Sequence, residues 1–546
     1  MSIEEPVCRL TIDVEKGGPI ELVVCNNIVL GEHEFDPVGP IVIHAADGTI
    51  ELRPDGMSQL GRRYPEASFA ITADPERIAA IGGDGLLHAD GVERGGPYVV
   101  IRTKPLEHVA VTYSGDLLDA GAAASRAARH SGAGDTPDDR AGEPSGATTF
   151  WSGLGRAARL GGGTARVVDD LARLDDVLRW YLHDALIHAT TPHGLEQSGG
   201  AAWGLRDVCQ GPTELFVATG QTGALREVLR TVYANQDRDS GDWPQWFMLD
   251  RHREIRAPDS HGDIIHWPIK ALCDYVEATN DLSILDEPVA WTEARTGAVS
   301  ADTDTIFAHT ERQIATIERA CIPGTALVTF GGGDWEDTLQ PVDPSMARRL
   351  VSSWTVELAY QTLGRYATLC ERAGRTALAA RLADLCERMR ADFQRHLVPD
   401  GVVAGLAEFN PDGVAYYLHP RDRQTGVDYR LLPMTRGMIS GMFTVEQATR
   451  HAALIERHLL FPDGVRLMDR PMEYRGGPSR IFKRAESAAN FGREVGLQYV
   501  HAHIRYIEAM TRMGRPTDAL RGLLAICPIG LERDVPSALP RQSNAF

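Results

Sequence analysis

Residues 330–341, FGGGDWEDTLQP, combine a sharply bending backbone with side chains that could perform acid catalysis. Three consecutive glycines allow a tight turn and a close approach of the backbone to a ligand. The carboxylates of Asp334, Glu336 and Asp337 are grouped around the indole of Trp335. A sugar ring could stack on this flat apolar face. A carboxyl group beside it would be partly desolvated, and its pKa would rise toward that of a general acid.

Two structural alternatives explain the same residues. Asp334 or Asp337 could cap a helix, and Trp335 could belong to the hydrophobic core. An acidic loop could also bind calcium, but the regular alternation of a calcium-binding loop is missing here. By itself the stretch favours a structural role over a site, and it is the other motifs that reverse this preference.

A second motif follows Trp203 and contains Arg206, Asp207 and Gln210. An arginine beside an aspartate, with an amide and an indole nearby, could form directional hydrogen bonds to several hydroxyl groups of one sugar. The alternative is a helix N-terminus whose Arg206 and Asp207 form a surface ion pair, which would contribute little. The sequence leaves both interpretations open.

A third group brings Trp243, Trp246 and Trp267 close to several polar side chains. The combination is more typical of a carbohydrate-binding surface than of a core, because a core has no need of so many polar groups. These polar residues are Asp242, Gln245, His261 and Asp263.

The last motif contains two histidines, His501 and His503, within a helical pattern. Positions i and i+2 do not share a helix face, so a two-histidine metal site is not expected there. One histidine could face a pocket and donate a hydrogen bond to an anion, while the other would be structural. The sequence alone does not decide which is which.

The composition argues against several classes of function. The formal net charge of −19 argues against nucleic acids and anionic membranes as partners. No apolar run reaches the roughly 18 residues of a membrane-spanning helix, and residues 1–6 lack the basic and apolar segments of a signal peptide. Eight cysteines occur without a CxxC pair, which indicates neither a zinc site nor a disulfide framework. The cytoplasm is therefore the expected location.

The order of patterns along the 546 residues predicts an α+β protein with several domains. Residues 1–115 are expected to form a β-rich domain, part of an antiparallel sandwich, whose last two strands would be joined by a turn at Lys104 and Pro105. The expected strands are 7–14, 20–30, 39–52, 98–103 and 108–113. Residues 116–166 are rich in glycine and alanine and predict a linker with one short helix at 120–129. We expect residues 120–165 to be poorly packed.

From about residue 167 the apolar period becomes that of helices. Residues 167–530 are expected to form a helical catalytic domain, and residues 531–546 a C-terminal extension. The first predicted helix begins near residue 167. Further helices are expected near 214–235, 263–279, 308–321, 345–374, 375–397, 444–460, 485–513 and 515–526. The long loops between them are 190–213, 237–262, 324–344, 400–436 and 461–484. Loops of this length in a compact domain are usually functional. Roughly a dozen helices with such loops favour an (α/α)6 barrel whose loops line a cleft at one end.

Several of these motifs occur in the order seen in glycoside hydrolase family 94, which the chain resembles over about residues 70–545. They are the Arg206-Asp207-x-x-Gln210 motif, the stretches 259–279 and 333–337, and the stretch 499–501. The family contains inverting phosphorylases of cellobiose, chitobiose and related β-glucans. Residues 210–214, 241–247 and 464–471 are most similar to its 1,2-β-oligoglucan phosphorylase branch.

The resemblance implies roles for individual residues. It makes Asp337 the general acid and assigns His501 to the phosphate site. It places Trp335, together with the pair of Arg206 and Asp207, in the sugar-binding subsite. With the motifs described above, the expected substrate-binding residues are Arg206, Asp207, Gln210, Trp243, Trp246, Asp263, Asp334 and Trp335.

The implied reaction is inverting phosphorolysis. Protonated Asp337 would donate to the glycosidic oxygen while inorganic phosphate attacks the anomeric carbon from the opposite face, giving α-glucose 1-phosphate and a shortened glucan. An inverting hydrolase needs a second carboxylate to activate water. Phosphate is itself the nucleophile, and it needs cations and hydrogen-bond donors such as arginine and histidine. An oligosaccharide and phosphate are the expected partners, and no metal or organic cofactor is expected.

The sequence also departs from the family pattern. Glu336 stands where an asparagine is more usual, and Gly211 stands where cellobiose phosphorylases place an acid. The chain stops at Phe546, whereas family members continue into a C-terminal β-domain, and residues beyond the barrel complete the phosphate site. We therefore expect a short or split member, in which a homodimer or a separate chain supplies the missing part.

Two other functions remain open. The chain could be an inactive glucan-binding remnant, or it could be an inverting hydrolase on the same barrel. The hydrolase would need a base carboxylate, for which Asp422, Glu473 and Glu486 are the candidates.

Overall fold

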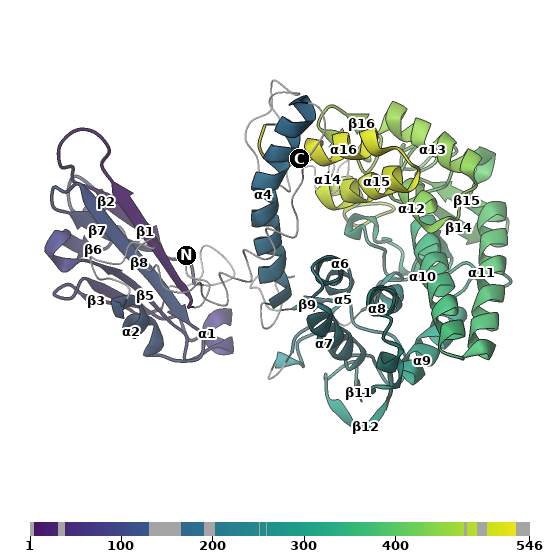
Figure 1. The fold of residues 1–546 in the computed structure, drawn as a ribbon, viewed down its shortest axis with the longest axis horizontal. Coiled ribbons are helices and arrows are strands. Elements are labelled where there is room, and N and C mark those ends of the chain that lie inside the picture. Colours follow the sequence, from purple (N-terminus) through teal and green to yellow (C-terminus); the bar gives the residue numbers. More distant parts are fainter. Residues whose placement is uncertain are drawn as a thin grey trace. The chain divides into compact units, whose positions relative to one another are not determined.

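The computed structural model describes residues 5–30, 39–129, 165–190, 202–249, 252–257, 259–473, 478–488 and 499–530 (Figure 1). The chain divides into two compact units. The first comprises Met1–Arg156 with Gln197–Gly200, and the second comprises Ala157–Glu196 with Ala201–Phe546. Each unit has its own hydrophobic core and is described here by itself.

The first unit contains two antiparallel sheets, one with the strand order β1-β8-β5-β4-β3 and the other with the order β2-β7-β6. Val24 and Ile101 of the smaller sheet pack in one cluster with Ile50, Ile71 and Val111 of the larger sheet. The two sheets therefore bury a common core, and the antiparallel sheet structure predicted from the sequence is present. The elements are β1 (Val7–Asp13), β2 (Val23–Asn27), β3 (Ile41–His44), β4 (Thr49–Leu52), α1 (Gln59–Arg63), β5 (Ser68–Ala73), η1 (Pro75–Arg77), β6 (Ile78–Gly82), η2 (Asp84–Leu87), β7 (Tyr98–Thr103) and β8 (His108–Asp116).

Two strands pair differently from the sequence expectation. β7 and β8 follow one another along the chain but belong to different sheets, so the segment at Lys104 and Pro105 connects the two sheets.

The sequence does not predict β5 and β6 at all. Their sequences, SFAITA and IAAIG, are rich in alanine, which is depleted in strands, so tertiary packing decides their conformation.

A short helix of the predicted linker packs onto the first unit. α2 (Ala122–Arg129) buries Ala123 and Ala127 completely against Ala70 of β5. Small alanine side chains allow this close contact between helix and sheet. The expectation of poor packing is therefore wrong for α2, and residues 130–164 lie outside the described residues.

The second unit is built mainly from helices around one large core. α6, α8, α10, α12 and α15 pack against one another in succession, and α4 packs against α6. α7, α11, α13 and α16 each pack against the helix that precedes them, as α10 and α11 do in Figure 1. The helices are α4 (Ala165–Thr190), α5 (Leu205–Val208), α6 (Gly211–Ala218), α7 (Thr222–Tyr233), η4 (Ile264–His266), α8 (Trp267–Thr279), η5 (Leu282–Asp286), α9 (Ile306–Arg319), η6 (Asp337–Leu339), η7 (Pro344–Arg348), α10 (Ser353–Arg372), α11 (Thr376–His396), η8 (Pro399–Gly401), α12 (Leu431–Ser440), α13 (Val445–His458), α14 (Ala485–Ala488), α15 (Val500–Arg512) and α16 (Pro516–Ala525).

Short antiparallel strands occupy segments between these helices. They are β9 (Trp203–Gly204) with β10 (Trp246–Phe247), β11 (Pro288–Thr292) with β12 (Val299–Thr305), β13 (Leu350–Ser352) with β14 (Leu406–Asn410) and β15 (Gly413–Tyr417), and β16 (Leu460–Phe461) with β17 (Gly464–Val465). The hairpin of β14 and β15 and the start of α12 lie in the stretch 400–436, which was expected to be a loop. The sequence of α12, LLPMTRGMIS, contains a proline and a glycine, but a proline in the first turn is compatible with a helix.

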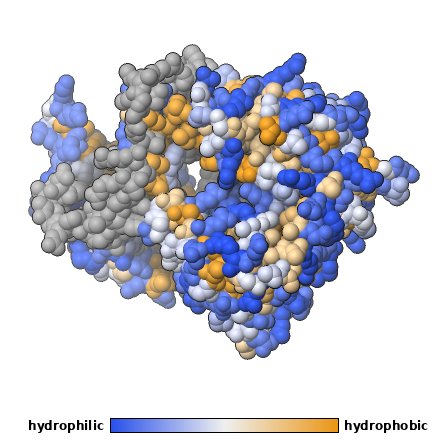
Figure 2. All heavy atoms as spheres, turned by 45° about the vertical axis from the view of Figure 1, so that its right-hand side comes forward, coloured by the Kyte–Doolittle hydropathy of each residue, from blue (hydrophilic) through white to orange (hydrophobic). Residues whose placement is uncertain are grey.

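The mainly hydrophilic surface agrees with the charged content of 24%. Hydrophilic side chains predominate on the face shown in Figure 2, with hydrophobic ones interspersed. Among the described helices, none is both long enough and apolar enough to cross a membrane.

Candidate active site

The buried guanidinium of Arg206 is the centre of the site. Arg206 lies on α5, and its Nε and Nη2 donate to the two carboxylate oxygens of Asp263 at 2.8 and 2.9 Å. Asp263 directly precedes η4 and also accepts a hydrogen bond from the indole N–H of Trp267 at 2.8 Å. This bidentate geometry fixes the plane of the guanidinium. Two of the sequence motifs, 57 residues apart, therefore meet in one ion pair.

Arg206 also holds residues 330–341, which we call the acid loop. Its Nη2 donates to the Asp334 carbonyl at 3.0 Å, and its Nη1 donates to the Trp335 carbonyl at 3.4 Å. The same Nη1 lies 3.4 Å from a carboxylate oxygen of Asp337. Burial opposes the charge of Arg206, but Asp263 and Asp337 outweigh it and raise the pKa of the guanidinium.

The three carboxylates of the acid loop have different surroundings. Asp334 and Glu336 are buried, whereas the side chain of Asp337 is 29% exposed. Burial raises the pKa of Asp334, but the charge and hydrogen bonds of Arg430, with a hydrogen bond from Ser352 at 2.6 Å, more than offset this. The pKa of Asp334 is therefore below its ordinary value, and this carboxylate stays ionised. Of the three acids, Asp337 is the one that a substrate can reach.

His261 is a further member of the site, although the sequence motifs indicate it only as one polar residue among several. Its Nδ1 lies 3.2 Å from Nη2 of Arg206 and 3.5 Å from a carboxylate oxygen of Asp337. Its Nε2 lies 3.2 Å from Nε2 of Gln340. His261 thus contacts the predicted acid and its neighbouring guanidinium at the same time.

Close backbone pairing brings His261 to the acid loop. The N–H of Gly262 donates to the carbonyl of Phe330 at 3.2 Å and to that of Gly333 at 2.9 Å. A Cβ atom at Gly262 would lie 2.4 Å from the Phe330 oxygen, which is too close for any side chain. A glycine is therefore required at this contact.

The indole of Trp335 faces two aromatic rings at the start of α15. The ring centres of Trp335 and His501 are 4.6 Å apart at an interplanar angle of 77°, and those of Trp335 and Tyr499 are 5.6 Å apart at 64°. Burial, aided by the charge of Arg505, lowers the pKa of His501 to about 3. His501 is therefore neutral at neutral pH and can donate one hydrogen bond without carrying charge.

His503 is held by the backbone instead. Its Nδ1 accepts a hydrogen bond from the N–H of Val465 at 3.1 Å, and its Nε2 donates to the Gly522 carbonyl at 2.8 Å. Both ring nitrogens are thus occupied within a buried environment. Of the two histidines, His501 is the one that lies beside the acid loop.

The structure buries two further residues that were predicted to bind substrate, Gln210 and Trp243. Gln210 is buried and donates to the Arg206 carbonyl at 3.2 Å, and Trp243 is buried with its indole N–H bonded to the Val232 carbonyl at 2.8 Å. The side chains of these two residues, like those of Asp263 and Asp334, are therefore buried and not placed to contact a sugar directly.

Two predicted residues keep partial exposure. Asp207 neighbours Arg206 on α5, and Trp246 lies on β10, which pairs with the strand directly before α5. The ring of Trp246 packs against Ala202 and Met248. The pairing of β9 with β10 connects the strand that carries Trp246 to the segment directly before α5.

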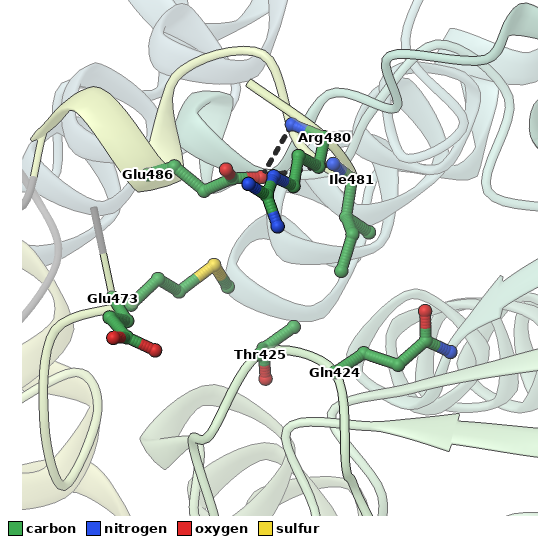
Figure 3. A pocket seen from close by; sticks show the side chains of 7 residues that line it. Gln424, Thr425, Glu473, Arg480, Ile481 and Glu486 are labelled. Carbon is green, nitrogen blue, oxygen red and sulfur yellow. Dashed lines mark hydrogen bonds between the residues drawn. The ribbon is translucent and has the colours of Figure 1, made fainter. Parts of the chain in front are cut away.

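Two of the three carboxylates considered as the base of a hydrolase accept hydrogen bonds from backbone N–H groups of nearby turns. Asp422 accepts hydrogen bonds from the N–H groups of Leu418, Gln424 and Thr425. Glu486 accepts from the N–H groups of Arg480 at 2.8 Å and Ile481 at 2.9 Å, as Figure 3 shows. These bonds engage both oxygens of Asp422 and one oxygen of Glu486, and they favour a structural role for both carboxylates over the activation of a water molecule.

Glu473, the third candidate, lines the small cavity shown in Figure 3 together with Glu486. The volume of this cavity is about 30 Å³, which is room for water but not for a sugar ring. In the part of the chain that the structure describes, no group of three or more His, Cys, Asp or Glu side chains is arranged to hold a metal ion.

Comparison with known proteins decides the family. A model of the glycosyl hydrolase 94 superfamily catalytic domain matches residues 250–538. The chain belongs to this superfamily. The match includes His261, Asp263, the acid loop, Arg430 and His501, so most of the site described above lies within the glycosyl hydrolase 94 catalytic domain.

Two curated relatives are phosphorylases. A 1,2-β-oligoglucan phosphorylase of Listeria innocua is 45% identical over 376 residues, which are 68% of this chain and 34% of that protein. A cellobionic acid phosphorylase of Neurospora crassa is 25% identical over 312 residues, which are 55% of this chain and 36% of that protein. The chain spans about a third of the length of these glycosyl hydrolase 94 relatives.

Among solved structures, a bacterial glucoamylase complexed with acarbose aligns with a TM-score of 0.46 at 9% sequence identity. The alignment covers 88% of this chain and 72% of that one.

Proposed function

We propose that this chain catalyses the inverting phosphorolysis of β-glucan oligosaccharides, with β-1,2-linked glucans as the substrate. Membership of the glycosyl hydrolase 94 superfamily and the 45% identity to a 1,2-β-oligoglucan phosphorylase support the reaction class. The observation that carries the proposal is the exposure of Asp337 beside Trp335, while the other two acids of the loop are buried.

Asp337 acts as the general acid in this proposal. It protonates the glycosidic oxygen as the bond to the anomeric carbon breaks, and a phosphate oxygen forms the new bond on the opposite face. The β-linkage becomes an α-phosphate, so the products are α-glucose 1-phosphate and a shortened glucan. Phosphate supplies the nucleophile, so no second carboxylate is needed. The engagement of Asp422 and Glu486 by the backbone agrees with this reaction and disfavours hydrolysis.

His501 and Trp335 complete the proposed site. The neutral imidazole of His501 donates a hydrogen bond to phosphate, and the partly exposed face of Trp335 packs against the sugar. Asp207 binds the sugar from α5, where Arg206 holds the acid loop behind it, and Trp246 borders the sugar. Inorganic phosphate is the co-substrate, with no metal or organic cofactor.

The wider architecture belongs to the proposal too. The succession of α6, α8, α10, α12 and α15 agrees with an (α/α)6 barrel, and four of these helices carry a following helix packed on them, namely α7, α11, α13 and α16. The site is formed at the N-terminal ends of these helices and in the loops before them. A cytoplasmic location completes the proposal.

One assay separates the three candidate functions. The chain is incubated with β-1,2-glucan oligomers, with and without phosphate, and both α-glucose 1-phosphate and free glucose are measured. The expected result is α-glucose 1-phosphate that forms only with phosphate, and no free glucose in the absence of phosphate. Free glucose that forms without phosphate indicates a hydrolase. Glucan binding without either product indicates a binding protein, and the Asp337→Asn variant serves as the control.

A further inference from the structure

A single guanidinium from a distant part of the chain binds two of the three carboxylates of the acid loop. Arg430 directly precedes α12, and its side chain is fully buried. Nη1 and Nη2 donate to the two oxygens of Asp334 at 2.9 and 3.0 Å, and Nε donates to Glu336 at 3.1 Å. The acids precede Arg430 by 96 and 94 residues.

Neighbouring donors complete this group, which we call the Arg430 cluster. The Ser352 hydroxyl donates to Asp334 at 2.6 Å, and the Glu336 N–H donates to Asp334 at 2.9 Å. The Thr338 hydroxyl donates to Glu336 at 2.9 Å. Two carboxylates share one guanidinium here, and such a buried group persists only when further hydrogen bonds satisfy the remaining lone pairs.

The side chains of the acid loop alternate between two directions. Asp334 and Glu336 are buried, whereas Trp335 and Asp337 are partly exposed. Glu336 has extended backbone angles, φ −94° and ψ 95°. Successive side chains of an extended chain point to opposite sides. Binding the first and third residues on the inner side therefore directs the second and fourth to the outer side.

Arg206 holds the same loop from another direction. It contacts the backbone carbonyls of Asp334 and Trp335, whereas Arg430 contacts the carboxylates of Asp334 and Glu336. The short segment between Asp334 and Asp337 is thus fixed by two buried arginines, one on α5 and the other before α12.

We propose that Arg430 is the positioning residue for acid catalysis: it holds Asp334 and Glu336 inward and thereby keeps Trp335 and Asp337 turned toward the substrate. The role rests on the proposed function, because it is phosphorolysis that uses the proton of Asp337. Arg430 is fully buried and does not touch the substrate. Its loss lets the loop shift, and a displacement of about 1 Å lowers turnover by about 10²-fold.

The first test uses Arg430→Lys, which keeps the charge but cannot bind both carboxylates in a fork geometry. We expect kcat for phosphorolysis to fall by about 10²-fold, while KM for phosphate stays near the native value. The matched control is Arg226→Lys. Arg226 also joins two carboxylates, Asp281 and Glu287, but it lies on α7 and has no part in the acid loop. An unchanged kcat in Arg430→Lys overturns the proposal.

A second pair of variants covers the case in which Arg430→Lys does not fold. Glu336→Gln keeps an oxygen that accepts from Nε of Arg430, whereas Glu336→Leu removes it. We expect turnover close to native for Glu336→Gln and clearly reduced turnover for Glu336→Leu, at unchanged KM for phosphate. Equal turnover in the two variants contradicts the proposal.

A spectroscopic measurement separates this proposal from the proposed function. The emission of Trp335 is obtained as the difference between each protein and the same protein carrying Trp335→Phe. We expect Arg430→Lys to change this emission and Arg226→Lys to leave it unaltered. The comparison is valid even if the native chain does not phosphorolyse glucans, and an unaltered Trp335 emission in Arg430→Lys overturns the positioning role.

Discussion

Asp334 and Asp337 belong to one loop and have the same side chain, yet their surroundings differ. Asp334 is buried against Arg430 and Ser352, and its pKa is lowered. Asp337 is partly exposed and touches Arg206 and His261 only at 3.4 and 3.5 Å. At the residue scale, the structure therefore separates the two acids: Asp334 holds the loop from the inside, and Asp337, the proposed general acid, keeps partial exposure.

The first prediction concerns Asp337→Asn. The amide keeps the shape of the side chain but has no acidic proton, so kcat for phosphorolysis should fall by about 10²- to 10⁴-fold. Binding of glucan, measured by calorimetry, should persist because the surrounding contacts remain.

The comparison is Asp334→Asn, which removes one partner of a buried ion pair. A change of this kind costs about 3–5 kcal/mol of stability, so Asp334→Asn should lower the melting temperature, whereas Asp337→Asn should not. Normal phosphorolysis by both variants would end the assignment of the acid loop as the active site.

The second prediction concerns the neutral state of His501. Its pKa is about 3 in the folded chain and about 6.5 in an unfolded one, so between these values only the unfolded state takes up the proton. This favours unfolding as the pH falls. Compared with the native protein, His501→Asn should therefore gain relative stability between pH 6.5 and pH 4 in thermal melts.

Gly211→Ala is the control for that experiment, because it lies in the same unit as His501 and changes no titratable group. The pH dependence of its melting temperature should match the native one throughout the same range. A native-like pH dependence in His501→Asn would show that His501 is protonated in the folded state as well.

At the scale of elements, the site depends on how closely separate segments approach. The stretch that carries His261 and Gly262 pairs with the acid loop through backbone hydrogen bonds. α5 is positioned by the pairing of β9 with β10, and Arg430 by the start of α12. Each catalytic or supporting side chain therefore sits where two or more elements meet.

The third prediction tests this approach with Gly262→Ala. The new Cβ would lie 2.4 Å from the Phe330 oxygen, so the backbone must move apart. Overpacking of this kind costs typically about 1–3 kcal/mol, and we expect both a lower melting temperature and a lower kcat.

Gly211→Ala is the matched control. A Cβ atom at Gly211 meets nothing within 4 Å, and the residue is the first of α6, where alanine is acceptable. Its melting temperature should equal or exceed the native value. Equal stability of the two variants would show that the space beside Gly262 can accept a Cβ atom, which contradicts the 2.4 Å distance to the Phe330 oxygen.

At the scale of the whole molecule, the two units have separate hydrophobic cores. Every site residue named above, from Arg206 to His501, belongs to the second unit. The part of the chain that matches the two phosphorylase relatives covers about a third of the length of each of them. The independent folding of the second unit is therefore a property to measure in solution.

The fourth prediction is that the two units unfold in separate transitions. All tryptophans except Trp151 lie in the second unit, so fluorescence follows that unit and far-ultraviolet circular dichroism follows both. A glucan oligomer at about 100 times its Kd should stabilise the second unit by about 2.7 kcal/mol and leave the other transition in place. A ligand-induced shift of both transitions together would contradict independent unfolding.

The sequence by itself determined the superfamily, the antiparallel sheets near the N-terminus and the acid loop as the main candidate for catalysis. These follow from local order, because motifs, helical periodicity and β-branched runs are properties of neighbouring residues. For the same reason α12, with its proline and glycine, and β5 and β6, with their alanines, could not be predicted: packing against distant segments stabilises them.

Only the tertiary structure decided which of the candidate side chains are buried and what holds them. Nothing in the sequence distinguishes the surroundings of Asp334 from those of Asp337, and nothing points to Arg430 as their partner. The contacts of Arg430 and Arg206 with the acid loop cross about 94–131 residues of chain. Such pairs form only when the helices that carry them pack together, since the distance along the chain says nothing about the distance in space.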